Sequence, residues 1–135
     1  SDLQKMTFIF IYGTLLPGLR LEAQMRGARF VAAAQVLGRL VDVGRYPGFL
    51  QGDGLVTGEV YEVDELHLAR LDLVEDMVPG DRAASQYWRE QVTVAAGQLH
   101  GQPVQTYVYK RPVDGCTAIA HGDYRRYIRE VGRES

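Results

Sequence analysis

Residues 56–75 read VTGEVYEVDELHLARLDLVE, a stretch that predicts a strand running directly into a helix. Val56–Val63 alternates in part between apolar and polar side chains, which is the pattern of a half-buried strand. Asp64 then places a side-chain oxygen at the N-cap of a helix that extends from Glu65 to about Val74. The chain therefore combines strand and helix, and the helix begins where the strand ends.

Outside this stretch, the sequence favours strands over helices. Runs of β-branched and aromatic residues predict further strands at 7–12, 87–95 and 103–110. An apolar stretch covers 28–43, and short helices are predicted at 20–26 and 123–131. Because strands and helices do not alternate along the chain, we expect an α+β fold with a curled, mixed sheet. No repeat or linker interrupts residues 1–135, which we interpret as a single domain.

Composition excludes several classes of protein. The 135 residues carry 15 basic and 17 acidic side chains, so the formal net charge of -2 provides no basic surface for nucleic acid. No apolar run approaches the ~20 residues that cross a bilayer. The single cysteine, Cys116, rules out an internal disulfide framework and fits a reducing compartment. We expect a cytoplasmic protein that binds neither nucleic acid nor membrane.

The sequence also lacks the common catalytic signatures. His67, His100 and His121 are far apart and have no companions at metal-ligand spacing, so we predict no metal site. Cys116 lies in no nucleophile motif. The loop at Gly13 lacks the Gly-Lys-Ser/Thr ending of a phosphate-binding loop. Any chemistry must therefore come from other groups.

Glu75 is the candidate acid. Leu68, Leu71 and Val74 share one face of the predicted helix, and Glu75 falls within that apolar stripe, with Asp72 at its edge. Burial and the negative end of the helix dipole both raise the pKa of such a carboxyl group, as a general acid/base at neutral pH requires. The alternative is that the helix ends before Glu75 and the carboxylate faces water.

A second candidate is the loop that follows the first strand. Gly13–Gly18 contains two glycines and a proline, which predicts a tight turn. Such a turn exposes backbone N–H groups, and Gly13 would let a ligand approach the main chain closely. These donors suit a carboxylate or a developing oxyanion. The alternative is an ordinary glycine turn with no ligand.

Five short motifs follow one another from Phe8 to about Tyr109. They are Tyr12-Gly13-Thr14-Leu15, Gly38-Arg39-Leu40 with Gly44-Arg45-Tyr46-Pro47-Gly48, Val56-Thr57-Gly58-Glu59-Val60-Tyr61, Leu71-Asp72-Leu73-Val74-Glu75, and Tyr87-Trp88-Arg89. In this order they resemble the gamma-glutamylcyclotransferase-like family, in particular its small bacterial-type gamma-glutamylamine cyclotransferase branch. One position departs from the pattern: the family often has glycine after the glutamate, and this chain has Asp76.

The resemblance implies a small, mixed β-barrel-like sheet flanked by helices, with one pocket at the barrel mouth. It implies release of 5-oxoproline from a small-molecule γ-glutamyl substrate without cofactor or metal. The main chain of Tyr12, Gly13, Thr14 and Leu15 would hold the glutamyl group, and Glu75 would be the general acid/base. Tyr87 would close over the ligand and Arg89 would pair with an acid, or either would be structural. Tyr46 and Pro47 would shape a wall of the pocket or only make a turn.

The resemblance leaves three properties open: whether the protein is a catalyst, what amine its substrate carries, and its oligomeric state. A protein that keeps the pocket but only binds its ligand is one alternative, and Asp76 leaves room for it. A γ-glutamyl acyltransferase, which passes the glutamyl unit to an outside amine, is another. The amine half of the substrate cannot be read from the sequence, and we expect a monomer or a weak homodimer.

Overall fold

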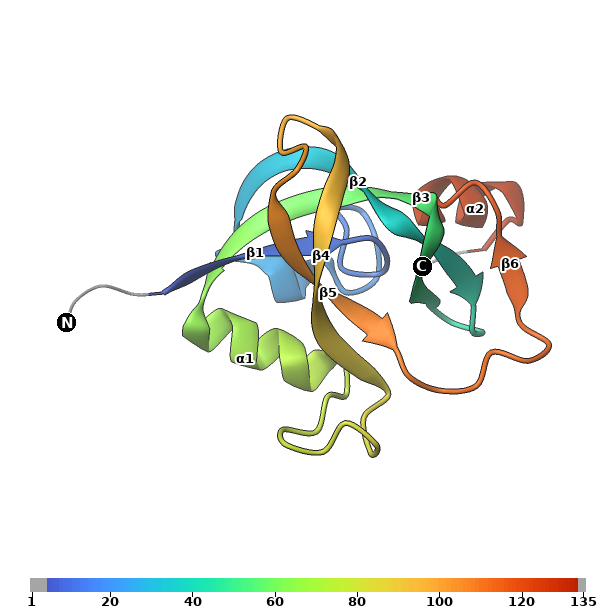
Figure 1. Ribbon diagram of the computed structural model, residues 1–135. Helices are drawn as coiled ribbons and strands as arrows, with labels where there is room; N and C mark the ends of the chain where they lie inside the picture. The colour runs from blue at the N-terminus through green and yellow to red at the C-terminus, as the bar shows by residue number, and fades with distance from the viewer. Residues whose placement is uncertain (1–4, 134–135) are drawn as a thin grey trace.

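The computed structural model describes residues 5–133 (Figure 1). Its elements in chain order are β1 (Met6–Ile11), the 3-10 helix η1 (Glu22–Met25), β2 (Arg29–Asp42), β3 (Pro47–Asp64), α1 (Glu65–Val74), β4 (Tyr87–Gly97), β5 (Pro103–Tyr109), β6 (Thr117–Ile119) and α2 (Tyr124–Glu130). None of the helices in residues 5–133 has the length and apolar character needed to cross a membrane.

Five of the strands close into a barrel. Their order is β3-β1-β5-β4-β2, and an additional pairing of β2 with β3 joins the two ends of this row. The β1–β5 pair is parallel and the other pairs are antiparallel, so the sheet is mixed. Strand β6 adds to the end of β2 outside the barrel. The α+β, barrel-like fold predicted from the sequence is confirmed, with α1 and α2 at different sides of the barrel (Figure 1).

Two sequence-based boundaries were wrong. Strand β3 begins at Pro47, whereas the sequence predicted a strand only from Val56. The intervening Gln51–Gly54 is exposed and contains two glycines, which hides the strand signal. Strand β6 has only three residues and was not predicted, because so short a segment carries no periodic pattern.

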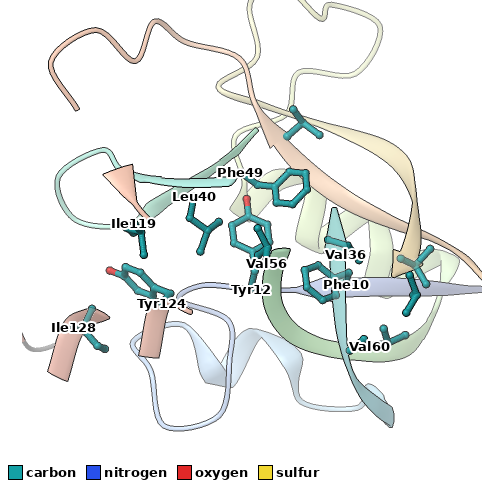
Figure 2. Packing of buried hydrophobic residues seen from close by; sticks show 14 residues of the cluster. Phe10, Tyr12, Val36, Leu40, Phe49, Val56, Val60, Ile119, Tyr124 and Ile128 are labelled. Carbon is teal, nitrogen blue, oxygen red and sulfur yellow. The ribbon is translucent and has the colours of Figure 1, made fainter. Parts of the chain in front are cut away.

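Alternate side chains of β1 enter two different hydrophobic cores. Phe10 points into the barrel, where it packs with residues from every barrel strand, among them Val36 and Val56 (Figure 2). Ile9 and Ile11 lie on the outer face, where α1 covers them. Burial on both faces explains why the first strand is continuously apolar. It also places the end of β1 at the point where the two cores meet.

Helix α1 is fixed at its beginning by the predicted cap. The carboxylate of Asp64 accepts a hydrogen bond from the backbone N–H of His67 at 2.8 Å. The His67 ring is buried and its Nε2 lies 2.8 Å from the carbonyl oxygen of Gln24, which ties α1 to the end of η1. Leu68 and Leu71 are buried against the outer core. His67 therefore has a structural role, and α1 is held at a defined position against β1.

Candidate active site

A cavity of about 260 Å³ lies where the loop after β1, the end of α1 and the start of β4 come together. A volume just below the range of about 300–1,000 Å³ for drug-sized ligands suits one small molecule. Its wall includes all the predicted site residues, namely Tyr12, Gly13, Thr14, Leu15, Glu75 and Tyr87. The structure thus brings together six residues that are separated by up to 75 positions in the sequence.

The loop after β1 presents backbone donors to this cavity. Tyr12, Gly13, Thr14 and Leu15 are buried, and the loop is closed by the bond from Leu21 N–H to the Thr14 carbonyl at 2.8 Å. Within residues 5–133, the N–H groups of Gly13, Thr14 and Leu15 donate to no protein acceptor. Buried backbone donors are nearly always paired, so three in succession in a segment that lines a cavity are suited to an anionic ligand.

Gly13 allows this loop to pack against the opposite wall. A Cβ atom at position 13 would lie 2.7 Å from Cγ of Pro47, which is too close for two carbon atoms. The proline ring cannot turn aside as a flexible side chain would, since its backbone torsion is fixed. The glycine is therefore required by a close approach of two segments, rather than by a turn alone.

Glu75 is the C-cap of α1 and contributes to the cavity wall. Its N–H donates to the Leu71 carbonyl at 2.9 Å, so Glu75 closes the last turn of the helix, which ends at Val74. Protein surrounds the side chain, yet it keeps partial exposure because it borders the cavity. Burial raises the pKa of Glu75 to about 7. A carboxyl group with this pKa can both accept and donate a proton near neutral pH.

Asp76 occupies a position that favours glycine. The N–H of Met77 donates to the Asp72 carbonyl at 2.9 Å, and the N–H of Asp76 donates to the Leu73 carbonyl at 3.0 Å. This pair of bonds is the Schellman motif, in which the residue after the cap has a left-handed backbone. Asp76 accordingly has φ of 58°. The departure from the family pattern therefore adds backbone strain at this position.

Replacing Asp76 with glycine is expected to stabilise the fold. Asp76→Gly removes the steric cost of a left-handed residue, which raises the free energy of unfolding by about 1 kcal/mol. Urea unfolding measures this change. Asp76→Ala is the matched control: it keeps a Cβ at the left-handed position and should give no such gain. Equal stabilisation by glycine and alanine would mean that the aspartate charge, and not the backbone, is the cause.

Arg89 does not belong to the cavity wall. Its guanidinium makes two hydrogen bonds to the Asp72 carboxylate, Nε to Oδ1 at 3.0 Å and Nη2 to Oδ2 at 3.1 Å. Asp72 is itself buried, and Tyr107 also donates to it at 2.6 Å. The expectation that Arg89 pairs with an acid is met by an acid of α1. The pair attaches the last turn of the helix, which carries Glu75, to β4.

Other cavity residues escaped the sequence reasoning. Arg20, Gln86 and Tyr107 line the wall although none was singled out. Tyr46 and Pro47, which the family resemblance gave as a pocket wall or a turn, also line the cavity. Tyr107 lies on β5, which is far from the other site residues in the sequence. The two tyrosines at alternate positions of this strand, Tyr107 and Tyr109, are the only sequence signal that could have pointed to it. For metals, residues 5–133 contain no group of three or more His, Cys, Asp or Glu side chains arranged to hold an ion.

The sequence matches the family described as "Gamma-glutamyl cyclotransferase, AIG2-like" over residues 9–126, a span that includes every predicted site residue. The chain belongs to this family. YtfP of Escherichia coli K12, named a gamma-glutamylcyclotransferase family protein, is 32% identical over 123 residues that cover 86% of the chain and 94% of that relative. A gamma-L-glutamyl-butirosin B gamma-glutamyl cyclotransferase of Niallia circulans is 37% identical over 126 residues, covering 90% of the chain and 78% of the relative.

The fold comparison agrees with this family membership. The crystal structure of an AIG2-like protein of Mus musculus matches with a TM-score of 0.72 at 29% identity, and the match covers 88% of each chain. The solution structure of YtfP from Escherichia coli matches with a TM-score of 0.65 at 30% identity. The closed barrel with its extra strand and two helices is thus a fold of gamma-glutamylcyclotransferase-like proteins.

Proposed function

We propose that this family member is an enzyme that releases 5-oxoproline from γ-glutamyl amines or peptides, with Glu75 as the general acid/base. One observation carries the proposal: a carboxyl group with a pKa of about 7 shares a small cavity with three backbone N–H groups that have no acceptor among residues 5–133. The N–H groups of Gly13, Thr14 and Leu15 would hold the α-carboxylate of the glutamyl unit. Glu75 would then lie beside the substrate's α-amine.

The reaction needs no nucleophile from the enzyme. Ionised Glu75 takes one proton from the substrate's α-ammonium, and the freed amine attacks the γ-carbonyl carbon. A C–N bond forms and closes the five-membered ring, and the γ-amide C–N bond then breaks. The ring nitrogen loses its second proton, and the departing nitrogen gains both protons by way of Glu75. The carboxylate ends in the state in which it began, and one group serves both transfers.

Positioning supplies much of the acceleration in such a ring closure. The attacking nitrogen and the carbonyl carbon belong to one molecule, so the enzyme has only to hold the chain of the substrate in a bent form. A small cavity with donors at one end and Glu75 in its wall is suited to that task. The relative from Niallia circulans supports the substrate class, since its name specifies a γ-glutamyl compound.

Incubation with a panel of γ-glutamyl compounds tests this proposal. The panel contains a γ-glutamyl amino acid, a γ-glutamyl polyamine and a peptide with a γ-glutamyl-lysine bond, and 5-oxoproline is measured by mass spectrometry. We expect 5-oxoproline and the free amine in equal amounts from at least one compound. A glutamyl unit transferred to an added amine would indicate an acyltransferase instead. Binding without any product would indicate a protein that only binds its ligand.

A further inference from the structure

The charged residue that follows Glu75 has no role in the reaction proposed above. Asp76 lines the cavity and is exposed, so it belongs to the part of the wall where the cavity opens to solvent. The ion pairs within residues 5–133 engage other side chains and leave the Asp76 carboxylate without a cationic partner. Arg82, a cation of the same loop, pairs with Glu90 instead. The charge of Asp76 is therefore available to a ligand.

A solvated carboxylate alone would need no explanation, but Asp76 stands where glycine is favoured. Its φ of 58° is left-handed, and the Schellman bonds at the end of α1 require that conformation. Aspartate lowers stability at this position, which is why Asp76→Gly is expected to raise it. A strained residue that persists on the wall of a cavity points to a function of its side chain, because the fold carries the cost elsewhere.

The two exposed charged residues of the cavity wall lie on different segments. Arg20 precedes Leu21, whose N–H donates to the Thr14 carbonyl at 2.8 Å, so Arg20 belongs to the loop that would hold the glutamyl carboxylate. Asp76 directly follows Glu75, which would return a proton to the departing nitrogen. The positive charge thus adjoins the anionic end of the substrate, and the negative charge adjoins the end where the amine half leaves.

The cavity is small compared with the distance over which charges act. Its volume is about 260 Å³, and the screening length is about 8 Å at physiological ionic strength. A charge on the wall therefore acts on a ligand in the cavity even without direct contact. The group that best matches a carboxylate without a partner is an ammonium, which adds N–H donors to the attraction between opposite charges.

We propose that Asp76 is a specificity-determining residue, which favours γ-glutamyl substrates whose amine half carries an ammonium group of its own, as the amine half of a diamine or polyamine does. The inference rests on the proposed function, because that reaction places the amine half beside Glu75. The same charge disfavours an amine half with a carboxylate next to the amide nitrogen, since like charges repel.

Two compounds of equal length isolate the effect of this ammonium. γ-Glutamylputrescine ends in an ammonium group, and γ-glutamyl-pentylamide has a methyl group in its place. Calorimetry is done on Glu75→Gln, in which turnover is slow, so binding is measured whether or not the wild type releases 5-oxoproline. We expect about 5-fold tighter binding of the ammonium compound at low salt, the upper range for an ion pair that solvent reaches, and a smaller ratio at high salt. Equal affinities at low salt would overturn the proposal.

Variants of Asp76 assign the preference to its charge. Asp76→Asn and Asp76→Gly, each combined with Glu75→Gln, remove the carboxylate, and both should bring the affinity ratio of the two compounds to about one. Glu65→Gln is the matched control, because Glu65 is an exposed acid at the other end of α1 and does not line the cavity. It should leave the ratio unchanged. A preference that is retained in both Asp76 variants would contradict the proposal.

Turnover by the wild type separates this inference from the proposed function. Release of 5-oxoproline from both compounds with equal kcat/KM would contradict selection by Asp76 and leave the proposed reaction intact. A preference in binding that depends on Asp76, without any 5-oxoproline from either compound, would support the role of Asp76 and contradict the reaction.

Discussion

Glu75→Gln is expected to lower kcat for 5-oxoproline release by about 10²–10⁴-fold, the usual contribution of a general acid/base. Glutamine has nearly the same size as glutamate and can still form hydrogen bonds, but it cannot exchange a proton. Binding of 5-oxoproline should persist in the variant, because the backbone N–H groups of residues 13–15 hold the carboxylate in our account. Steady-state kinetics and calorimetry on the same preparation measure the two effects.

The stability of the variant distinguishes a catalytic from a structural glutamate. The pKa of Glu75 is about 7 in the folded protein and 4.5 in an unperturbed glutamate, so the folded state binds its proton more tightly. The contribution of Glu75 to stability is therefore fully present below pH 4.5 and is lost as the pH rises through about 7. Glu75→Gln should remove this pH dependence and be at least as stable as the wild type above pH 7.

Leu71→Ala is the control for damage to the helix. Leu71 is fully buried one turn before Glu75, and its truncation should reduce the free energy of unfolding by about 2–5 kcal/mol. Leu71→Ala should therefore lower stability because it removes packing contacts. Glu75→Gln should lower the rate because it removes the group that exchanges a proton. If Glu75→Gln unfolded the protein while turnover per folded molecule stayed unchanged, Glu75 would be structural.

Local patterns were enough to predict most of the framework. Asp64 caps α1, as its position between the predicted strand and helix indicates, and Asp123, the first residue of the helix predicted at 123–131, caps α2. The apolar stripe of α1 predicted that Glu75 faces the protein, because residues spaced at the 3.6-residue period of a helix lie on one side of it. Glu75 does line the cavity. The shift in its pKa follows from burial, and burial follows from that stripe.

Other features depend on contacts between distant segments and could not be predicted. The first residues of β3, Pro47–Leu50, are held in the sheet by pairing with Arg39–Asp42 of β2, and the exposed Gln51–Gly54 separates them from the part of the strand that the sequence predicted. Tyr107 reaches the cavity only because β5 pairs with β1 in parallel, across a barrel whose closure no local pattern specifies. The left-handed backbone of Asp76 was invisible because aspartate seldom marks such a position.

A dependence on pH follows from the environment of Glu75. Only the ionised carboxylate can take the first proton from the substrate, so the free enzyme becomes inactive as Glu75 is protonated. With a pKa of about 7, kcat/KM should fall about tenfold for each pH unit well below that value. At pH 5 the loss should reach about 100-fold relative to the plateau. The loss should be reversible on returning to pH 8, since no unfolding is involved.

The most direct test is the pH dependence of kcat/KM for 5-oxoproline release from the best substrate of the panel. We expect an acidic limb with an apparent pKa of about 7, which reports the free enzyme and belongs to Glu75. In Glu75→Gln the small remaining activity should lack this limb. An acidic limb near 4.5, the value of an unperturbed glutamate, or the same limb retained in Glu75→Gln would contradict the assignment of Glu75 as the acid/base.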